Sequence, residues 1–145
     1  MPEWTSWVPV YKRDILRAAG EYSIEPVKLA AVVMQESAGD ARAYRYEPAY
    51  WDRYLADKPE YGPPAEGEGA LHLWKRRVSA SYGLCQLMYP TAVWLMGGAQ
   101  FAPEELFEPG LSLDLGARLL RLHLDKGRTW RQSLAAYNTG RARDD

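Results

Sequence analysis

The 145-residue sequence has little of what a disulfide-stabilised, metal-binding or membrane-spanning protein needs. Cys85 is the single cysteine, so no intramolecular disulfide can form. The two histidines, His72 and His123, lie far apart and have no partner at the spacing of zinc ligands, so we expect no metal and no other cofactor. No segment reaches the length of a transmembrane helix, and we expect no integral membrane segment.

The sequence also has no large excess of positive or negative charge. The sequence has 18 basic and 19 acidic residues, which gives a net charge of -1. A protein that binds nucleic acid or an anionic membrane by its charge needs a basic surface, so we expect neither partner. The first residues lack the basic and apolar regions of a secretory signal, so a substrate outside the cytoplasm would require another route of delivery.

What the sequence does contain is helical periodicity, which predicts one mainly α domain over residues 1–145. Helices are expected at residues 8–19, 26–37, 49–56, 90–96, 102–107, 111–126 and 129–140. Pro9 would lie in the first turn of the first helix, and Thr129 would cap the last. Between residues 39 and 79 the pattern dissolves, so a long loop insertion with an exposed stretch at 58–69 is expected.

One carboxylate interrupts an apolar stripe. Leu29, Val32, Val33 and Glu36 follow the i, i+3, i+4, i+7 spacing of one buried helix face, which puts Glu36 on the core side. Burial and the negative end of the helix dipole would both raise the pKa of this carboxyl. A raised pKa suits a proton donor. Spacing alone leaves the alternative that Glu36 turns outward or pairs with an arginine such as Arg42.

Further motifs resemble one known family. Glu36 is followed by Ser37, the stretch SYGLCQLMYPTA occupies residues 81–92, and AAYNTG occupies residues 135–140. RYEP at residues 45–48 is similar to a stretch in a subset of the same proteins. In this order they resemble the lytic transglycosylases with a lysozyme-like fold, relatives of goose-type lysozyme. The resemblance covers most of the chain and implies a lysozyme-like helical domain with a long loop insertion.

The resemblance implies cleavage of the β-1,4 bond between N-acetylmuramic acid and N-acetylglucosamine in peptidoglycan. Glu36 would protonate the departing oxygen and then, as a base, accept the proton of the muramic 6-hydroxyl, which gives a 1,6-anhydro sugar. No second carboxylate is required, because the N-acetyl group of the substrate stabilises the intermediate in this family. Asp40 and Glu47 are the candidates for a second carboxylate, and we expect Glu47 instead to hold the loop through Arg45 or through a neighbouring backbone group.

The resemblance also implies a set of substrate-binding residues: Ser37, Gln86, Tyr137, Tyr46, Asn138 and Ser81. Tyr137 would place its hydroxyl against Glu36. Each has a structural alternative: Tyr137 as a core aromatic, Gln86 as a turn-capping amide, and Ser37 as a hydroxyl bonded one turn back. Ser81 and Asn138 could hold turns, and the aromatic cluster that includes Tyr46 could stack on sugars or fill a core.

The sequence departs from the family pattern at three points. Cys85 stands where methionine is common, Thr139 replaces a small alanine, and the chain ends soon after AAYNTG, either as a compact variant or without a C-terminal part.

Three functions therefore stay open: a lytic transglycosylase, a hydrolytic lysozyme on the same scaffold, and a non-catalytic cell-wall-binding module. We expect a monomer that acts on glycan strands of the bacterial cell wall. It would be delivered by a phage virion or lysis system, or form a domain of a larger exported protein.

Overall fold

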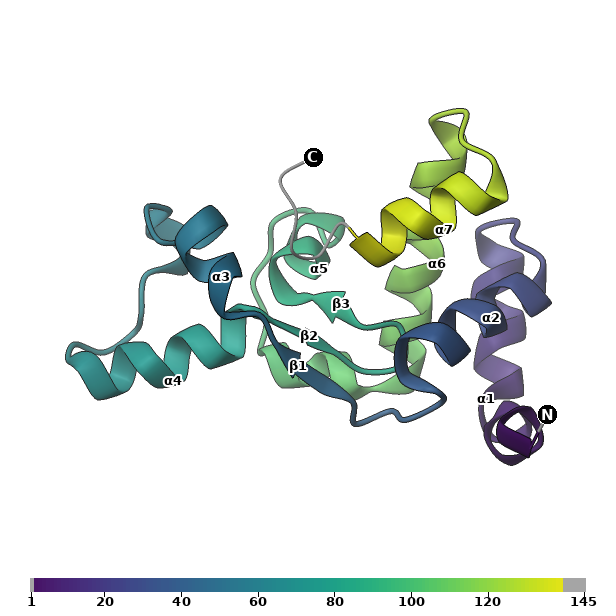
Figure 1. Cartoon of the computed structure of the whole chain (residues 1–145), viewed down its shortest axis with the longest axis horizontal. Helices are drawn as coiled ribbons and strands as arrows, with labels where there is room; N and C mark the ends of the chain where they lie inside the picture. Colours follow the sequence, from purple (N-terminus) through teal and green to yellow (C-terminus); the bar gives the residue numbers. More distant parts are fainter. Residues whose placement is uncertain (1, 140–145) are drawn as a thin grey trace.

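The computed structural model describes residues 2–139, and the side chains of residues 6–137. Four helices form what we call the helical body: α1 (Pro2–Glu21), α2 (Pro26–Ser37), α6 (Pro109–Asp125) and α7 (Trp130–Thr139). In Figure 1 they lie on the right, and α6 is central, because α1 and α7 both pack against it while α2 packs against α1. The mainly α, lysozyme-like fold expected from the sequence is confirmed.

A small antiparallel sheet adjoins the body. Its strands are β1 (Tyr44–Tyr46), β2 (Ala80–Tyr82) and β3 (Leu87–Met88), in that order across the sheet. Tyr44 pairs with Tyr82, and Ser81 pairs with Met88. Helix α5 (Tyr89–Leu95) and the 3₁₀ helix η3 (Pro103–Phe107) follow the last strand.

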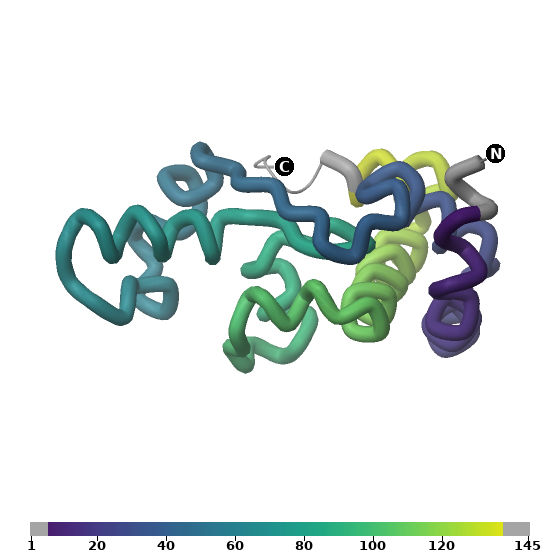
Figure 2. Tube along the Cα trace, turned by 90° about the horizontal axis from the view of Figure 1, so that it is seen from below, coloured from purple at the N-terminus to yellow at the C-terminus, as the bar shows by residue number. Residues whose placement is uncertain are grey.

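Residues 48–78 form a second region, which we call the lobe. It contains α3 (Pro48–Tyr50), the π-helical η1 (Trp51–Leu55), the 3₁₀ helix η2 (Pro59–Tyr61) and α4 (Glu68–Val78). Figures 1 and 2 both show the lobe projecting from the sheet on the side away from the helical body. Its buried hydrophobic side chains are Trp51, Leu55, Tyr61 and Val78.

The core forms where apolar helix faces meet. Leu29, Val32 and Val33 of α2 are fully buried, as are Leu113 and Leu120 of α6, so burial removes their apolar surface from water and stabilises the body. The last helix begins as expected: Gln132 N donates to Thr129 Oγ1 at 3.1 Å, and Thr129 N donates to Gln132 Oε1 at 2.9 Å. This reciprocal pair is a capping box.

One helix boundary and the three strands differ from the sequence-based expectation. Helix α1 begins at Pro2, so the expectation that Pro9 lies in the first turn is wrong, and Pro9 lies inside the helix. Pro2 already supplies the proline that favours a helix start. The three strands were not expected. Segments of two or three residues are too short to show the alternation of apolar and polar residues that identifies a strand.

Helix α4 is the main correction in the 39–79 segment, where only a short helix at 49–56 was expected. Leu71, Trp74 and Val78 follow i, i+3, i+7 spacing, yet only Val78 of the helix is buried. Trp74 Nε1 donates to the Tyr61 carbonyl at 2.7 Å and ties α4 to η2. The stretch at 58–69 is exposed as expected, except for the buried Tyr61.

Candidate active site

Glu36 occupies the last turn of α2, where the buried stripe leaves the core. The three apolar residues of the stripe are 0 % exposed, whereas Glu36 is only partly buried. Gln35 Nε2 donates to Glu36 Oε2 at 3.4 Å at the surface. The expectation that Glu36 lies on the core face is therefore corrected: the stripe reaches the helix end, and its carboxylate lies at the border between core and solvent.

Ser37 fixes the end of this helix. Its hydroxyl donates to the Leu84 carbonyl at 2.8 Å and also lies 3.2 Å from the Val33 carbonyl one turn back. Gly39 N donates to the same hydroxyl at 3.3 Å. The side chain next to Glu36 thus joins α2 to the turn at residues 83–86.

The chain reverses directly after Ser37. Ala38 has a φ of 52° and donates its N–H to the carbonyls of Val33 and Met34. Gly39 has a φ of 83°, and a Cβ atom at this position would lie 2.2 Å from Cγ of the buried Trp7. Only glycine fits here without displacing the indole or straining the backbone.

The turn at residues 83–86 is held by the amide of Gln86. Its Oε1 accepts from Ser81 Oγ at 3.0 Å, and its Nε2 donates to the carbonyls of Ala43 and Gly83 at 3.1 and 3.0 Å. Gln86 itself has a φ of 50° and is 5 % exposed. Gln86 therefore makes the contacts of a turn-capping amide, which was the alternative to substrate binding. The hydroxyl of the buried Ser81 has Gln86 as its hydrogen-bond partner.

Tyr137 reaches the same turn from α7. Its hydroxyl donates to the Cys85 carbonyl at 2.7 Å, and its side chain is 4 % exposed. A Cβ atom on Gly116 of α6 would lie 2.5 Å from Cys85 Sγ and 3.2 Å from the Tyr137 hydroxyl oxygen. The absence of a side chain at residue 116 therefore lets the turn and the tyrosine approach α6.

Cys85 connects this packing to Glu36. Burial raises the pKa of the Cys85 thiol to about 12, with bonds from Tyr137 and Ser112 opposing the shift and the charge of Glu36 adding to it. The thiol is therefore protonated at neutral pH. Ser37, the neighbour of Glu36, bonds the Leu84 carbonyl at 2.8 Å, so the end of α2 that carries Glu36 lies beside the same turn.

A cavity of about 160 Å³ opens beside these residues. It is lined by Gln86, Leu87, Met88, Thr91, Leu119, His123, Ala136 and Tyr137. The structure thus brings together Ser37, Gln86 and Tyr137, three of the substrate-binding residues expected from the sequence, at the junction of α2, the 83–86 turn and α7.

The family model described as the transglycosylase SLT domain matches residues 14–145 of the chain. The chain belongs to this family. Membership supports a peptidoglycan-cleaving activity of the lytic transglycosylase type. Searches of curated proteins and of solved structures found no significant match to this SLT domain.

Tyr46, another predicted substrate-binding residue, does not line the 160 Å³ cavity. Tyr46 is in β1, with the Arg76 guanidinium 4.7 Å from its ring centroid, an arrangement that favours a cation–π contact. The side chain of Asn138 lies outside the described residues. Arg45 Nε lies 3.0 Å from Glu47 Oε2, so the expected pairing of Glu47 with Arg45 is present.

The 160 Å³ cavity is also lined by two polar residues that we did not predict from the sequence to be site residues, Thr91 and His123. Arg128 Nη1 lies 2.5 Å from His123 Nδ1, and burial together with the Arg128 charge lowers the pKa of the imidazole. An arginine only donates, so Nδ1 accepts, and His123 is a neutral ring with its proton on Nε2. His123 follows Leu119 by four residues and so lies on the same face of α6. This spacing is the sequence feature that could have identified it.

Within the described part of the SLT domain, no group of three or more His, Cys, Asp and Glu side chains is arranged to hold a metal ion. Among the same residues, no helix combines the length and apolarity needed to cross a bilayer.

Proposed function

We propose that the SLT domain is a lytic transglycosylase in which Glu36 alone serves as acid and base. The substrate is the β-1,4 bond between N-acetylmuramic acid and N-acetylglucosamine, and the place of action is the bacterial cell wall. Family membership supports the reaction type. The observation that carries the assignment to Glu36 is its position as a partly exposed carboxylate on the last turn of α2, beside the turn that holds Gln86 and Cys85.

In the first step, Glu36 donates its proton to the glycosidic oxygen as the bond to the muramic anomeric carbon breaks. In the second, the carboxylate accepts the proton of the muramic 6-hydroxyl, and that oxygen bonds to the anomeric carbon. The products are a 1,6-anhydromuramic end and a free 4-hydroxyl on the N-acetylglucosamine. Glu36 is protonated again and no water is consumed.

The surroundings of the other carboxylates support a single acid. Glu47, whose side chain is 13 % exposed, is paired with Arg45, and Asp40 accepts from Arg42 N at 2.9 Å in a local turn. Both have structural partners, which favours roles in holding the 40–47 segment over activation of a water molecule. The hydroxyls of Ser37 and Tyr137 donate to neighbouring carbonyls of the 83–86 turn and tie α2 and α7 to it. Preorganised catalysis requires such fixed surroundings.

The test is mass spectrometry of soluble products from purified sacculi, with a Glu36→Gln variant beside the parent protein. Anhydro products should fall by about 100- to 10,000-fold in the variant, the range lost with one acid–base group. Glu25→Gln is the matched control, because Glu25 precedes the same helix at its other end and its side chain is 68 % exposed. It should behave as the parent.

Other outcomes identify the rival functions. Hydrated reducing ends that depend on Glu36 would make the protein a hydrolytic lysozyme. Binding to sacculi with no product from the folded parent protein would make it a cell-wall-binding module. Equal activity of Glu36→Gln and Glu25→Gln would remove Glu36 from the reaction.

A further inference from the structure

A cavity lies between the lobe and α5. Its volume is about 650 Å³, within the range of about 300–1,000 Å³ typical of sites for small ligands. The lobe contributes residues from Tyr50 to Tyr61, and the other wall runs from Pro90 to Gln100. Gln100 Nε2 donates to the Glu60 carbonyl at 2.8 Å and closes one end. Thr91 lines this cavity and also the smaller one beside Tyr137, so the two adjoin.

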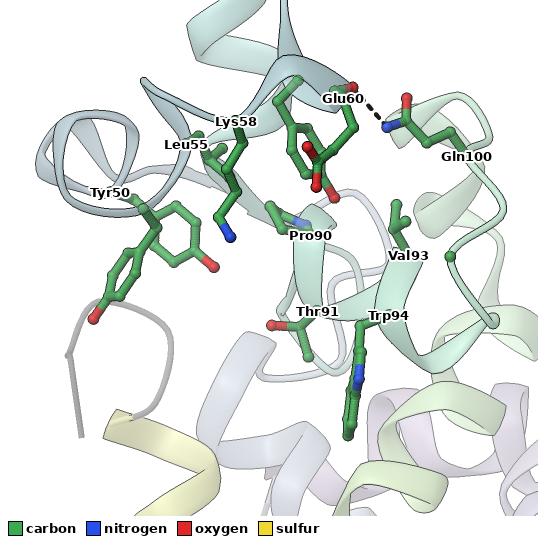
Figure 3. Close-up of a pocket in the computed structure, with 12 residues that line it drawn as sticks. Tyr50, Leu55, Lys58, Glu60, Pro90, Thr91, Val93, Trp94 and Gln100 are labelled. Atoms are coloured by element: carbon green, nitrogen blue, oxygen red, sulfur yellow. Dashed lines mark hydrogen bonds between the residues drawn. The ribbon is translucent and has the colours of Figure 1, made fainter.

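Charges of both signs enter the cavity from the lobe. Figure 3 shows the side chains of Lys58 and Glu60 extending into it, with Pro90 and Thr91 opposite. Neither side chain forms an ion pair with another described residue, although five such pairs are formed elsewhere in that part of the chain. An ammonium and a carboxylate are thus both available to a ligand.

A buried hydroxyl in the same wall also lacks a partner. Tyr54 lines the cavity, and its hydroxyl oxygen is buried with no hydrogen-bond partner among the described residues. Tyr50 packs beside it, with ring centroids 4.6 Å apart, and burial raises the pKa of Tyr50 to about 12. A buried donor without a partner is unfavourable, so a ligand group that accepts from Tyr54 would be stabilised there.

We propose that this cavity binds the stem peptide of peptidoglycan, an inference that rests on the proposed function. The glycan strand carries N-acetylated sugars and has no charge once the muramic lactyl group is in amide linkage to the stem. The stem carries free carboxylates and, at its diamino acid, an ammonium. Lys58 would bind a stem carboxylate, Glu60 the ammonium, and Tyr54 an amide carbonyl. A neutral sugar would leave both charges without a complement.

The position of the cavity agrees with the chemistry of the linkage. The stem branches from the muramic acid whose anomeric carbon reacts, so a stem site must adjoin the cleavage site. Thr91 is shared with the smaller cavity, which Gln86 also lines. Gln86 belongs to the turn that is bonded by Ser37, the neighbour of Glu36. Lys58 and Glu60 would then determine specificity for strands that carry stems.

Binding is measured by calorimetry on the full chain carrying Glu36→Gln, so that no turnover interferes. The two probes are the tetrapeptide L-Ala-D-isoGlu-meso-diaminopimelyl-D-Ala and a GlcNAc tetrasaccharide. Adding Lys58→Met should raise the Kd for the tetrapeptide about tenfold or more, the loss expected for a charged hydrogen bond. The matched control is Lys12→Met, at an exposed lysine of α1.

A second readout uses turnover. In the background with intact Glu36, Lys58→Met should lower the ratio of activity on intact sacculi to activity on amidase-stripped strands about tenfold, and Lys12→Met should leave the ratio unchanged. Circular dichroism confirms that each variant is folded.

Two results would overturn the inference. One is the absence of tetrapeptide binding to the folded protein. The other is a Lys58→Met variant that loses the tetrasaccharide and retains the tetrapeptide, which would make the cavity a glycan site. Failure of the proposed function differs from both, because the tetrapeptide would still bind, with its Lys58 dependence, while sacculi yield no Glu36-dependent product.

Discussion

Around Glu36, glycines occupy positions where a side chain cannot fit, whereas two glycines of the lobe face open space. A Cβ atom on Gly39, Gly83 or Gly116 would lie 2.2 to 2.5 Å from Trp7, the Leu106 carbonyl or Cys85. At Gly67 and Gly69 of the lobe, nothing lies within 4 Å. The comparison teaches that the segment around Glu36 is positioned by close packing, while the lobe offers surfaces that tolerate change.

Polar contacts follow the same division. Ser37, Gln86 and Tyr137 tie buried segments together around the site. The lobe is joined to the rest of the molecule partly through exposed contacts, among them the pair between Arg77 and Glu104. Exposed pairs contribute little to stability, so the Arg77–Glu104 pair adds little to the attachment of the lobe.

The largest effect is expected from Gly39→Ala. The new Cβ would meet Trp7 Cγ at 2.2 Å and stand at a φ of 83°, so we expect a loss of about 2–4 kcal/mol in the free energy of unfolding. Cleavage of sacculi should fall by about 100-fold, since the turn after Glu36 must shift. Thermal unfolding and product release measure the two losses.

Gly20→Ala is the control for this change, because nothing lies within 4 Å of a Cβ there. Adding Trp7→Leu to Gly39→Ala should restore part of the activity by making room. Equal stability of Gly39→Ala and Gly20→Ala would show that Trp7 does not fix the turn.

The second prediction sets one helix glycine of each region against the other. Gly116→Ala in α6 should cost about 1–3 kcal/mol of unfolding free energy, because its Cβ would lie 2.5 Å from Cys85 Sγ. Gly69→Ala in α4 should add about 0.5–1 kcal/mol, the gain of alanine over glycine in an open helix position. Urea unfolding of both variants measures the two changes in unfolding free energy. Changes of the same sign would contradict the difference in packing between body and lobe.

The smallest effect is expected from Glu104→Gln, which removes the pair with Arg77. Hydrogen bonding and the charge of Arg77 lower the pKa of Glu104 from its ordinary 4.5. A depressed pKa means that the stabilisation is present above the unfolded value of 4.5 and is lost as pH falls through the folded value. At pH 7 the variant should be less stable by about 0.2–1 kcal/mol, because both side chains are largely exposed.

Unfolding curves at pH 7 and pH 3 check this prediction. The difference between parent and Glu104→Gln should shrink at the lower pH, and Glu66→Gln in the exposed 58–69 stretch serves as the control. A difference that persists at pH 3 would mean that the charge of Glu104 is not what joins the lobe to η3.

Much of the fold was predictable because a long helix repeats its apolar spacing over several turns. The stripe of α2 and the capping residue Thr129 are local features, and the structure has both. The strands and α4 were missed for different reasons. Strands of two or three residues carry too short a pattern, and α4 buries only Val78, so its apolar stripe is incomplete.

The candidate site was predictable as a set of residues but not as an arrangement. Motifs nominated Glu36, Gln86 and Tyr137, and their roles in the reaction stay predictions. That Glu36 is partly exposed depends on where the α2 stripe meets the 83–86 turn. His123 was passed over because a lone histidine in a leucine-rich helix has no local sign of Arg128 beside it.

By itself, the sequence determined the mainly α fold, the family and the carboxylate expected to react. Periodicity, caps and motifs each depend on residues that are close together in the sequence. Only the tertiary structure decided that Trp7 packs on Gly39, that Gly116 admits Cys85 and Tyr137, and that Lys58 and Glu60 enter one cavity. These contacts join residues far apart in the chain, and close packing permits them only where the partner leaves room.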